Sequence, residues 1–210
     1  MEPSPLEATP VQPDAEVALL RRALDGDLEG FNGLVELYQR AVFNLCLRML
    51  GSPPAAEDAA QDAFLSAYRS LRTFRGSAFR PWLMRIAANA CTDELRRRGR
   101  RPALSLDAPV AGSDDHIDVP DPAAGPEVEA LRSEQATIVQ AGLLKLPHDQ
   151  RLAVVMCDIQ GFAYEEIAQA MGCSVGTVKS RIARGREKLR RELGPMKEQS
   201  PNLERQRIET

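Results

Sequence analysis

The sequence predicts an all-α protein with two small helical domains joined by a flexible acidic linker, the second domain containing a helix-turn-helix. Apolar residues recur at helical spacing over residues 14–101 and again over residues 126–193. Between them, residues 102–125 contain five aspartates and no lysine or arginine, a composition that cannot form a core. Residues 1–13 are predicted to be a disordered tail, and residues 194–210 a polar tail. A length of 210 residues suits this division.

Three helices are expected in the first 75 residues. A short amphipathic helix over about residues 14–26 precedes a longer one over residues 31–50, which is apolar on more than one side and is closed by Gly51. Such a helix lies at the centre of a bundle. The third helix begins at Pro53 and Pro54, because proline is tolerated in the first turn, and it runs to about Phe74.

The third helix carries an outward-facing polar patch. Its apolar face includes Ala59, Ala63 and Ala67, whereas Asp58, Gln61 and Asp62 point away from that face. These three residues form an acidic, hydrogen-bonding patch without bulky neighbours. On composition alone, the favoured interpretation is an ordinary solvated helix face.

A fourth helix is predicted to start at Pro81 and to run to about Gly99. Leu83, Ile86 and Cys91 are among its core positions, and Trp82 is expected to pack with them and not against DNA. The exposed positions become strongly basic towards the end of the helix: Arg96, Arg97, Arg98, Arg100 and Arg101. This helix is therefore a candidate for contact with nucleic acid.

Residues 162–191 read as two helices joined by a tight turn. The first, over residues 164–171, stops at Gly172, a residue type that tolerates a left-handed cap. Ser174 restarts the chain as a helix by accepting a hydrogen bond from a backbone N–H of the next turn. Two further helices, over about residues 126–145 and 147–161, are expected to support this helix-turn-helix.

The second helix of this motif has an apolar side and an opposite side of small and basic residues. The DNA-facing candidates on and beside the opposite side are Thr177, Lys179, Ser180, Arg181 and Arg184. A helix that enters the major groove needs a slim end, hydrogen-bonding side chains next to it, and cations for the phosphates. A solvated basic helix is the alternative, but the basic face follows a helix-turn-helix break in a chain of net charge −3. The pattern therefore predicts a DNA-recognition helix.

Composition excludes several other classes of protein. The four cysteines are widely spaced with no CxxC pair, and His116 and His148 lie far from them in the sequence, so a metal site or disulfide framework is not expected. No cofactor is predicted. No apolar run is long enough to cross a bilayer, and the acidic, proline-rich N-terminus is unlike a signal peptide. The expected location is the cytoplasm.

Three blocks in series carry a resemblance to a known family. They are residues 31–51, FNGLVELYQRAVFNLCLRMLG; residues 56–101, AEDAAQDAFLSAYRSLRTFRGSAFRPWLMRIAANACTDELRRRGRR; and residues 146–193, LPHDQRLAVVMCDIQGFAYEEIAQAMGCSVGTVKSRIARGREKLRREL. Together they closely resemble an extracytoplasmic-function sigma factor of bacterial RNA polymerase, from roughly residue 14 to residue 193. The resemblance implies two helical domains, no enzyme activity, and promoter recognition and duplex melting on behalf of core polymerase.

The resemblance also implies roles for individual residues. Core polymerase would bind Asp58, Gln61 and Asp62; the minus-10 element would contact Arg75, Gly76, Ser77, Asn89, Arg96 and Arg97; and the minus-35 element would contact Thr177, Lys179, Ser180, Arg181 and Arg184. Asn89 would read an extruded base, since an amide offers a donor and an acceptor. The acidic linker would thread polymerase channels that otherwise hold nucleic acid.

The implied partners are core RNA polymerase, promoter DNA and an anti-sigma factor, without a small-molecule substrate. An anti-sigma partner would hold the protein at the inner face of the membrane. Two rival functions would require other sequence features. A conventional helix-turn-helix regulator would carry a sensor or dimerisation motif in its first half, where a second basic helix stands instead. An enzyme acting on DNA would need a catalytic constellation, but Asp93 and Glu94 are adjacent and diverge by about 100° on a helix.

Overall fold

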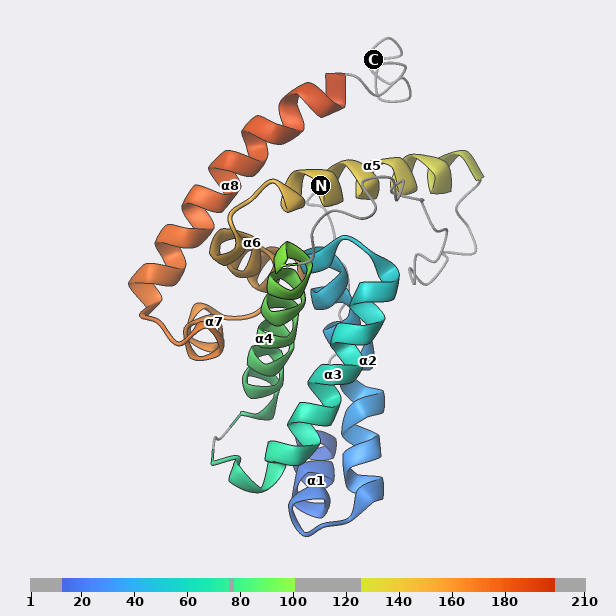
Figure 1. Ribbon diagram of the computed structural model, residues 1–210, viewed down its shortest axis with the longest axis vertical. Coiled ribbons are helices and arrows are strands. Elements are labelled where there is room, and N and C mark those ends of the chain that lie inside the picture. The colour runs from blue at the N-terminus through green and yellow to red at the C-terminus, as the bar shows by residue number, and fades with distance from the viewer. Residues whose placement is uncertain (1–12, 76–77, 101–125, 199–210) are drawn as a thin grey trace.

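The computed structural model describes residues 13–75, 78–100 and 126–198, and Figure 1 shows that these residues form an assembly of helices. The helices are α1 (Pro13–Leu24), α2 (Leu28–Leu50), α3 (Pro53–Ser70), α4 (Phe79–Arg100), α5 (Pro126–Leu144), α6 (His148–Val154), α7 (Tyr164–Met171) and α8 (Val175–Glu198). A 3-10 turn, Leu71–Thr73, follows α3, and a π-helical turn, Val155–Ile159, follows α6. The predicted all-α fold class is confirmed.

Several expectations fall on residues outside these ranges. The structure does not describe residues 1–12 of the predicted N-terminal tail, nor the predicted linker of residues 102–125. The candidate site residues Gly76 and Ser77 also lie outside the described residues. At the other end, α8 continues to Glu198, so residues 194–198 are helical where the sequence predicted a tail. Among the described helices, none combines the length and apolar character needed to cross a bilayer.

Helix α2 is the centre of the N-terminal bundle, as predicted. Asp27 accepts a hydrogen bond from Glu29 N at 2.9 Å and so caps the first turn, and a hydrogen bond from Arg22 holds the pKa of Asp27 below its usual value. Gly51 ends the helix in the left-handed conformation, with φ of 72°. Leu34, Val42 and other apolar side chains from more than one side of α2 are buried.

Helix α3 packs closely against α2 and α4 because its buried face is built from alanines, Ala56, Ala59, Ala63 and Ala67. Helix α4 begins at Phe79, two residues before the predicted start at Pro81. Phe79 enters an aromatic cluster in which its ring centroid lies 5.4 Å from that of Trp82 and 6.0 Å from that of Phe74. Trp82 is therefore a packing residue, as expected.

In the C-terminal half, α8 crosses α5 and α6 at glycines. A Cβ atom at Gly185 would lie 2.7 Å from Val154 Cγ2, and one at Gly142 would lie 2.9 Å from Leu189 Cδ1. A Cβ atom at either glycine would force the facing side chain to shift. Figure 1 shows α8 (red) running along the outside of this half, with α7 at its N-terminal end.

The two halves pack against each other. Helix α4 packs against α7, and α2 packs against α5 and α6 (Figure 1). Met84 and Ala88 of α4 are buried, although they are not among the core positions predicted for this helix.

Candidate nucleic-acid interface

The turn between α7 and α8 has the predicted geometry. Gly172 adopts φ of 61°, and Ser174 Oγ accepts a hydrogen bond from Thr177 N at 3.2 Å. Ile167 of α7 and Val178 and Ile182 of α8 are buried between the helices. Because these apolar contacts fix one side of α8, its opposite side faces away from the protein.

That opposite side carries a hydrogen-bonded series of side chains. Thr177 Oγ1 lies 2.9 Å from Ser174 Oγ, Ser180 Oγ donates to Thr177 O at 2.9 Å, and Arg184 Nη2 donates to Ser180 Oγ at 3.1 Å. Thr177, Ser180 and Arg184 are thus brought together along one face of α8, as predicted. The series fixes the direction of the Arg184 guanidinium along the helix surface.

Lys179 and Arg181 lie on either flank of this face in different surroundings. Lys179 is exposed, with its Nζ 5.8 Å from the centroid of the Tyr164 ring. Arg181 donates to Asp149 Oδ2 at 2.6 Å and to Cys173 Sγ at 3.5 Å, and its side chain is only 24% exposed. Arg181 therefore joins α8 to α6, a contact that helical periodicity alone does not predict.

Other arginines of α8 also have acidic partners within the protein. Arg186 donates to Asp158 Oδ2 at 3.0 Å, and this carboxylate raises the pKa of the guanidinium. Arg190 and Arg191 pair with Glu187. Within the described residues, Lys179, Arg184 and Lys188 of this helix have no ion pair with a carboxylate, and of these Lys179 and Arg184 lie on or beside the face predicted to contact DNA.

The candidate minus-10 residues of α4 lie on its exposed side. Asn89 is exposed, and Arg96 and Arg97 are exposed with ion pairs to Asp93 and Glu94, respectively. Arg75 lies apart from them at the end of the 3-10 turn, where its Nη1 donates to Arg72 O at 2.7 Å and to Phe74 O at 3.1 Å.

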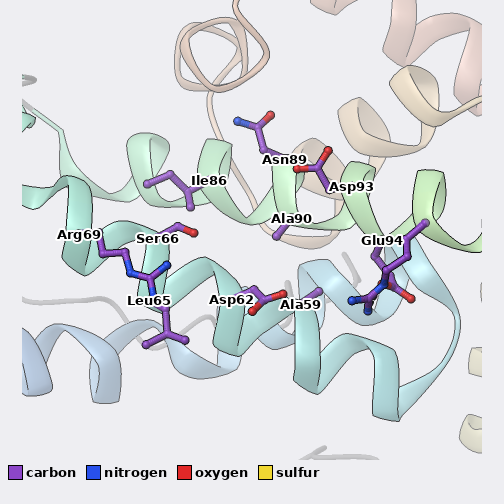
Figure 2. A pocket seen from close by; sticks show the side chains of 11 residues that line it. Ala59, Asp62, Leu65, Ser66, Arg69, Ile86, Asn89, Ala90, Asp93 and Glu94 are labelled. Carbon is purple, nitrogen blue, oxygen red and sulfur yellow. Dashed lines mark ion pairs between the residues drawn. The ribbon is translucent and has the colours of Figure 1, made fainter.

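A cleft of about 600 Å³ lies between α3 and α4. Ala59, Asp62 and Leu65 line it from α3, and Ile86 and Asn89 from α4 (Figure 2). Asn89 stands on the edge of the cleft that is further from α3 (Figure 2), and Arg97 also lines the cleft. The cleft therefore brings one predicted polymerase residue, Asp62, to the same surface as two predicted minus-10 residues.

The patch of Asp58, Gln61 and Asp62 is exposed, but the expectation that it lacks bulky neighbours is wrong. Leu65 and Tyr68 follow at helical spacing on the same face, 47% and 51% exposed, and the Tyr68 ring contacts that of Phe31 with centroids 5.0 Å apart. The positions of Leu65 and Tyr68 at i+7 and i+10 from Asp58 were readable in the sequence. The exposure of these two side chains was not, because apolar residues in a helix are expected to be buried.

Comparison with known proteins identifies both halves of the chain. Residues 34–101 match the family described as Sigma-70 region 2, and residues 136–189 match the family described as Sigma-70, region 4. The chain is 41% identical to the ECF RNA polymerase sigma-E factor of Escherichia coli (strain K12) over 180 residues, covering 85% of this chain and 94% of that protein. The chain belongs to the extracytoplasmic-function sigma factors. It is also 40% identical to the RNA polymerase sigma-H factor of Pseudomonas aeruginosa over 183 residues, covering 85% and 93% of the two chains.

Solved structures of sigma factors share the fold of this sigma factor. The structure of CnrH in complex with the cytosolic domain of CnrY matches with a TM-score of 0.63 and 26% identity, covering 86% of this chain and 97% of that one. The sigma factor RpoE in complex with the anti-sigma factor NepR from Bartonella quintana matches with a TM-score of 0.57 and 25% identity, covering 78% and 96%. As a sigma factor, the protein directs RNA polymerase to promoters.

Proposed function

We propose that this sigma factor divides its work among three surfaces: α8 reads the minus-35 element, α4 reads the melted minus-10 element, and α3 binds core polymerase. The observation that carries this proposal is the series Thr177, Ser180 and Arg184 on the exposed face of the helix-turn-helix. It is supported by the match of this half to region 4 and of the other half to region 2.

At the minus-35 element, the small side chains at the start of α8 let the helix enter the major groove, where Arg184 can reach base edges. Lys179 lies on the flank and pairs with phosphate. A well-made arginine contact to guanine contributes about 1–3 kcal/mol of discrimination, whereas a phosphate contact strengthens binding to every sequence alike. Arg181 is held by Asp149 and supports the position of α8. Only the N–H groups of Arg181 that do not bond to Asp149 can contact phosphate.

At the minus-10 element, Asn89 reads a base that has left the duplex. A base exposes its full hydrogen-bonding edge only when it is unstacked and unpaired, and the cleft beside Asn89 has room for it. Arg75, Arg96 and Arg97 are exposed and contact the phosphates of the separated strand. Gly76 and Ser77 follow Arg75 in the sequence, and the resemblance alone assigns them to contact with the minus-10 element.

Core polymerase binds the face of α3 formed by Asp58, Gln61 and Asp62, extended by Leu65 and Tyr68. A polar rim beside exposed leucine and tyrosine side chains is the composition of a protein-binding surface. We therefore assign residues 14–101 to the binding of core polymerase and of the minus-10 element. We assign residues 126–193 to the binding of the minus-35 element.

The proposal extends to the mode of action, the partners and the location of the protein. The protein acts by binding and not by catalysis, and it works in the cytoplasm, where polymerase and promoter DNA are found. An anti-sigma factor controls it, an inference supported by the complex of the similar sigma factor RpoE with NepR, and such a partner can hold it at the inner membrane face.

The test is run-off transcription with purified bacterial core RNA polymerase on a library of promoter fragments, with and without the protein. Transcripts that begin a fixed distance from a shared two-part motif, only when the protein is present, are the expected result. The double variant Asp58→Asn, Asp62→Asn should lose most of this activity, and Glu57→Gln, at a neighbouring exposed position of α3, is the matched control. Binding to duplex DNA without initiation on core polymerase would instead identify a conventional helix-turn-helix regulator.

A further inference from the structure

Lys188 is a cation of α8 to which the reading of the minus-35 element gives no role. It follows Arg184 by one helical turn, about 6 Å along the helix axis, so the two side chains are neighbours on the helix surface. Among the described residues, Lys188 has no ion pair with a carboxylate. Its side chain is half-buried, so the surrounding protein restricts where its ammonium group can lie.

Lys188 lines a cleft of about 610 Å³ between α6 and α8, two helices that pack against each other (Figure 1). Gln150 lines this α6–α8 cleft from α6, and Arg184 and Arg191 line it from α8. The close crossing of the two helices at Gly185 brings Gln150 there, because a Cβ atom at Gly185 would lie only 3.2 Å from Gln150 O. One amide side chain and three cationic side chains therefore share one hollow.

The acidic side chains of the α6–α8 cleft are paired within the protein. Glu187 accepts hydrogen bonds from two guanidinium groups, that of Arg190 at 2.6 Å and that of Arg191 at 3.0 Å. Glu192 pairs with Lys145 of α5, with 2.9 Å between Nζ and Oε2. The cleft and these partners thus hold five cations against two carboxylates: Lys145, Arg184, Lys188, Arg190 and Arg191 against Glu187 and Glu192. The excess of positive charge suits an anion.

The anion that fits this position is a phosphate of the DNA backbone. The major groove is about 12 Å wide and phosphates border it on both sides, so a cation one turn beyond a base-reading residue meets the backbone. Phosphate oxygens accept from ammonium, guanidinium and amide N–H groups, which Lys188, Arg191 and Gln150 offer. The carboxylate of Asp149, next to Gln150 in the sequence, is paired with Arg181 at 2.6 Å.

We propose that the α6–α8 cleft binds one backbone phosphate beside the minus-35 element, with Lys188 supplying charge and Gln150 and Arg191 supplying N–H donors. This inference rests on the proposed reading of the minus-35 element by α8. Phosphate contacts fix the register and orientation of a protein on the duplex and carry no sequence information themselves. The cleft therefore positions α8 in the groove, while Arg184 distinguishes the bases.

Single methylphosphonate linkages, in which a neutral methyl group replaces a charged phosphate oxygen, test this contact. The holoenzyme formed with core polymerase is titrated on promoter duplexes that carry one such linkage at each position around the minus-35 element in turn. Lys188→Gln should bind the unmodified duplex several-fold more weakly than the wild type, and one linkage that weakens the wild type several-fold should not weaken Lys188→Gln further. Lys188→Arg keeps the charge and should behave like the wild type. Arg21→Gln removes an exposed cation of α1 and is the matched control.

Salt dependence and base changes give two independent readouts. Between 50 and 200 mM salt, one phosphate contact accounts for a factor of about 3 in the loss of affinity. The loss of affinity over this range should therefore be about threefold smaller for Lys188→Gln than for the wild type. Single-base changes in the minus-35 element should affect Lys188→Gln and the wild type by equal factors, because a phosphate contact serves every sequence alike.

Either of two results would overturn the proposal. If every linkage weakens Lys188→Gln and the wild type by the same factors, Lys188 contacts no phosphate. If Lys188→Gln binds core polymerase more weakly before DNA is added, the cleft binds an acidic protein surface instead. Circular dichroism melting verifies that the variants are folded. If base changes in the minus-35 element leave wild-type binding unchanged while one linkage still depends on Lys188, the phosphate site stands and the proposed reading of that element fails.

Discussion

Arg181 and Arg184 lie three residues apart on α8, yet their side chains have different surroundings. Arg181 is held by Asp149 and Cys173, whereas the hydrogen bonds of the Arg184 side chain to other described residues all go to Ser180 of its own helix. Moving Arg184 onto a base edge breaks weak local contacts, but moving Arg181 breaks an ion pair between helices. The sequence predicted both as DNA contacts because it shows the side of a helix and not the partners across from it.

Arg184→Ala should change promoter choice, whereas Arg181→Ala should weaken binding to all promoters alike. Loss of a guanine contact at one position removes about 1–3 kcal/mol of discrimination there, which is roughly 5- to 150-fold. Binding of each variant to a set of single-base changes in the minus-35 element measures both effects. A uniform loss across the set for Arg184→Ala would reassign that residue to phosphate.

Tyr38 is a buried residue with a polar partner near the surface. Its hydroxyl donates to Glu16 Oε2 at 2.7 Å and so fastens α1 to α2, and burial raises the pKa of Tyr38 well above its usual value. Tyr38→Phe should lower the free energy of unfolding by about 1–2 kcal/mol at pH 7. Urea unfolding measures this change in the free energy of unfolding. The control is Tyr68→Phe, because the ring of Tyr68 is half exposed.

The difference in free energy of unfolding between the wild type and Tyr38→Phe should shrink at alkaline pH. The pKa of Tyr38 is raised in the folded protein. Its contribution to stability is therefore fully present below the pKa of an unfolded tyrosine, about 10, and is lost as the pH rises through the pKa of the folded state. Unfolding measured at pH 7 and at pH 11 tests the sign. An equal or larger difference between wild type and Tyr38→Phe at pH 11 would contradict it.

At the scale of elements, periodicity and caps predicted most of the helices. Gly51, Gly172 and Ser174 end or begin helices where expected, because each acts through its own local backbone geometry. The start of α4 was placed two residues late, since Phe79 is drawn into the helix by the aromatic cluster, a tertiary effect. The close crossing of α8 over α6 at Gly185 is also tertiary.

Gly185→Ala should push α8 away from α6. The new Cβ would lie 2.7 Å from Val154 Cγ2 and 3.2 Å from Gln150 O, and overpacking of this kind costs about 1–3 kcal/mol. Gly176→Ala on the same helix is the control, because its Cβ would meet nothing nearer than Ser174 Oγ at 3.8 Å. Thermal unfolding should show a lower Tm only for Gly185→Ala; a normal Tm there would mean that the crossing adapts at no cost.

For the whole molecule, the sequence predicted two domains but not their packing. A hydrophobic pattern reports that a face is buried and says nothing of what buries it, so the packing of α4 against α7 could not be predicted. Arg151 and Gln160 were not predicted either, because polar residues buried between domains have no sequence signature. The surfaces that remain exposed, on α3 and α8, were predicted because they break the apolar pattern.

Charge is segregated over the whole chain. The net charge is −3, although α8 and the end of α4 are basic, and five aspartates lie in the linker: Asp107, Asp114, Asp115, Asp118 and Asp121. If the linker occupies polymerase channels that otherwise hold nucleic acid, as the resemblance implies, its negative charge matches their basic walls. Replacing all five by serine should reduce run-off transcripts several-fold at low salt.

The reduction should be smaller at high salt, because the screening length falls from about 10 Å at 0.1 M to about 3 Å at 1 M and the wild-type advantage falls with it. The matched control replaces the same five aspartates by glutamate, which keeps the charge and should keep the activity. Run-off yield and core-polymerase affinity are each measured at two salt concentrations. Together they distinguish an effect of the linker's charge from an effect of its length. A serine variant that binds core polymerase and initiates like the wild type at both concentrations would show that the linker acts only as a tether.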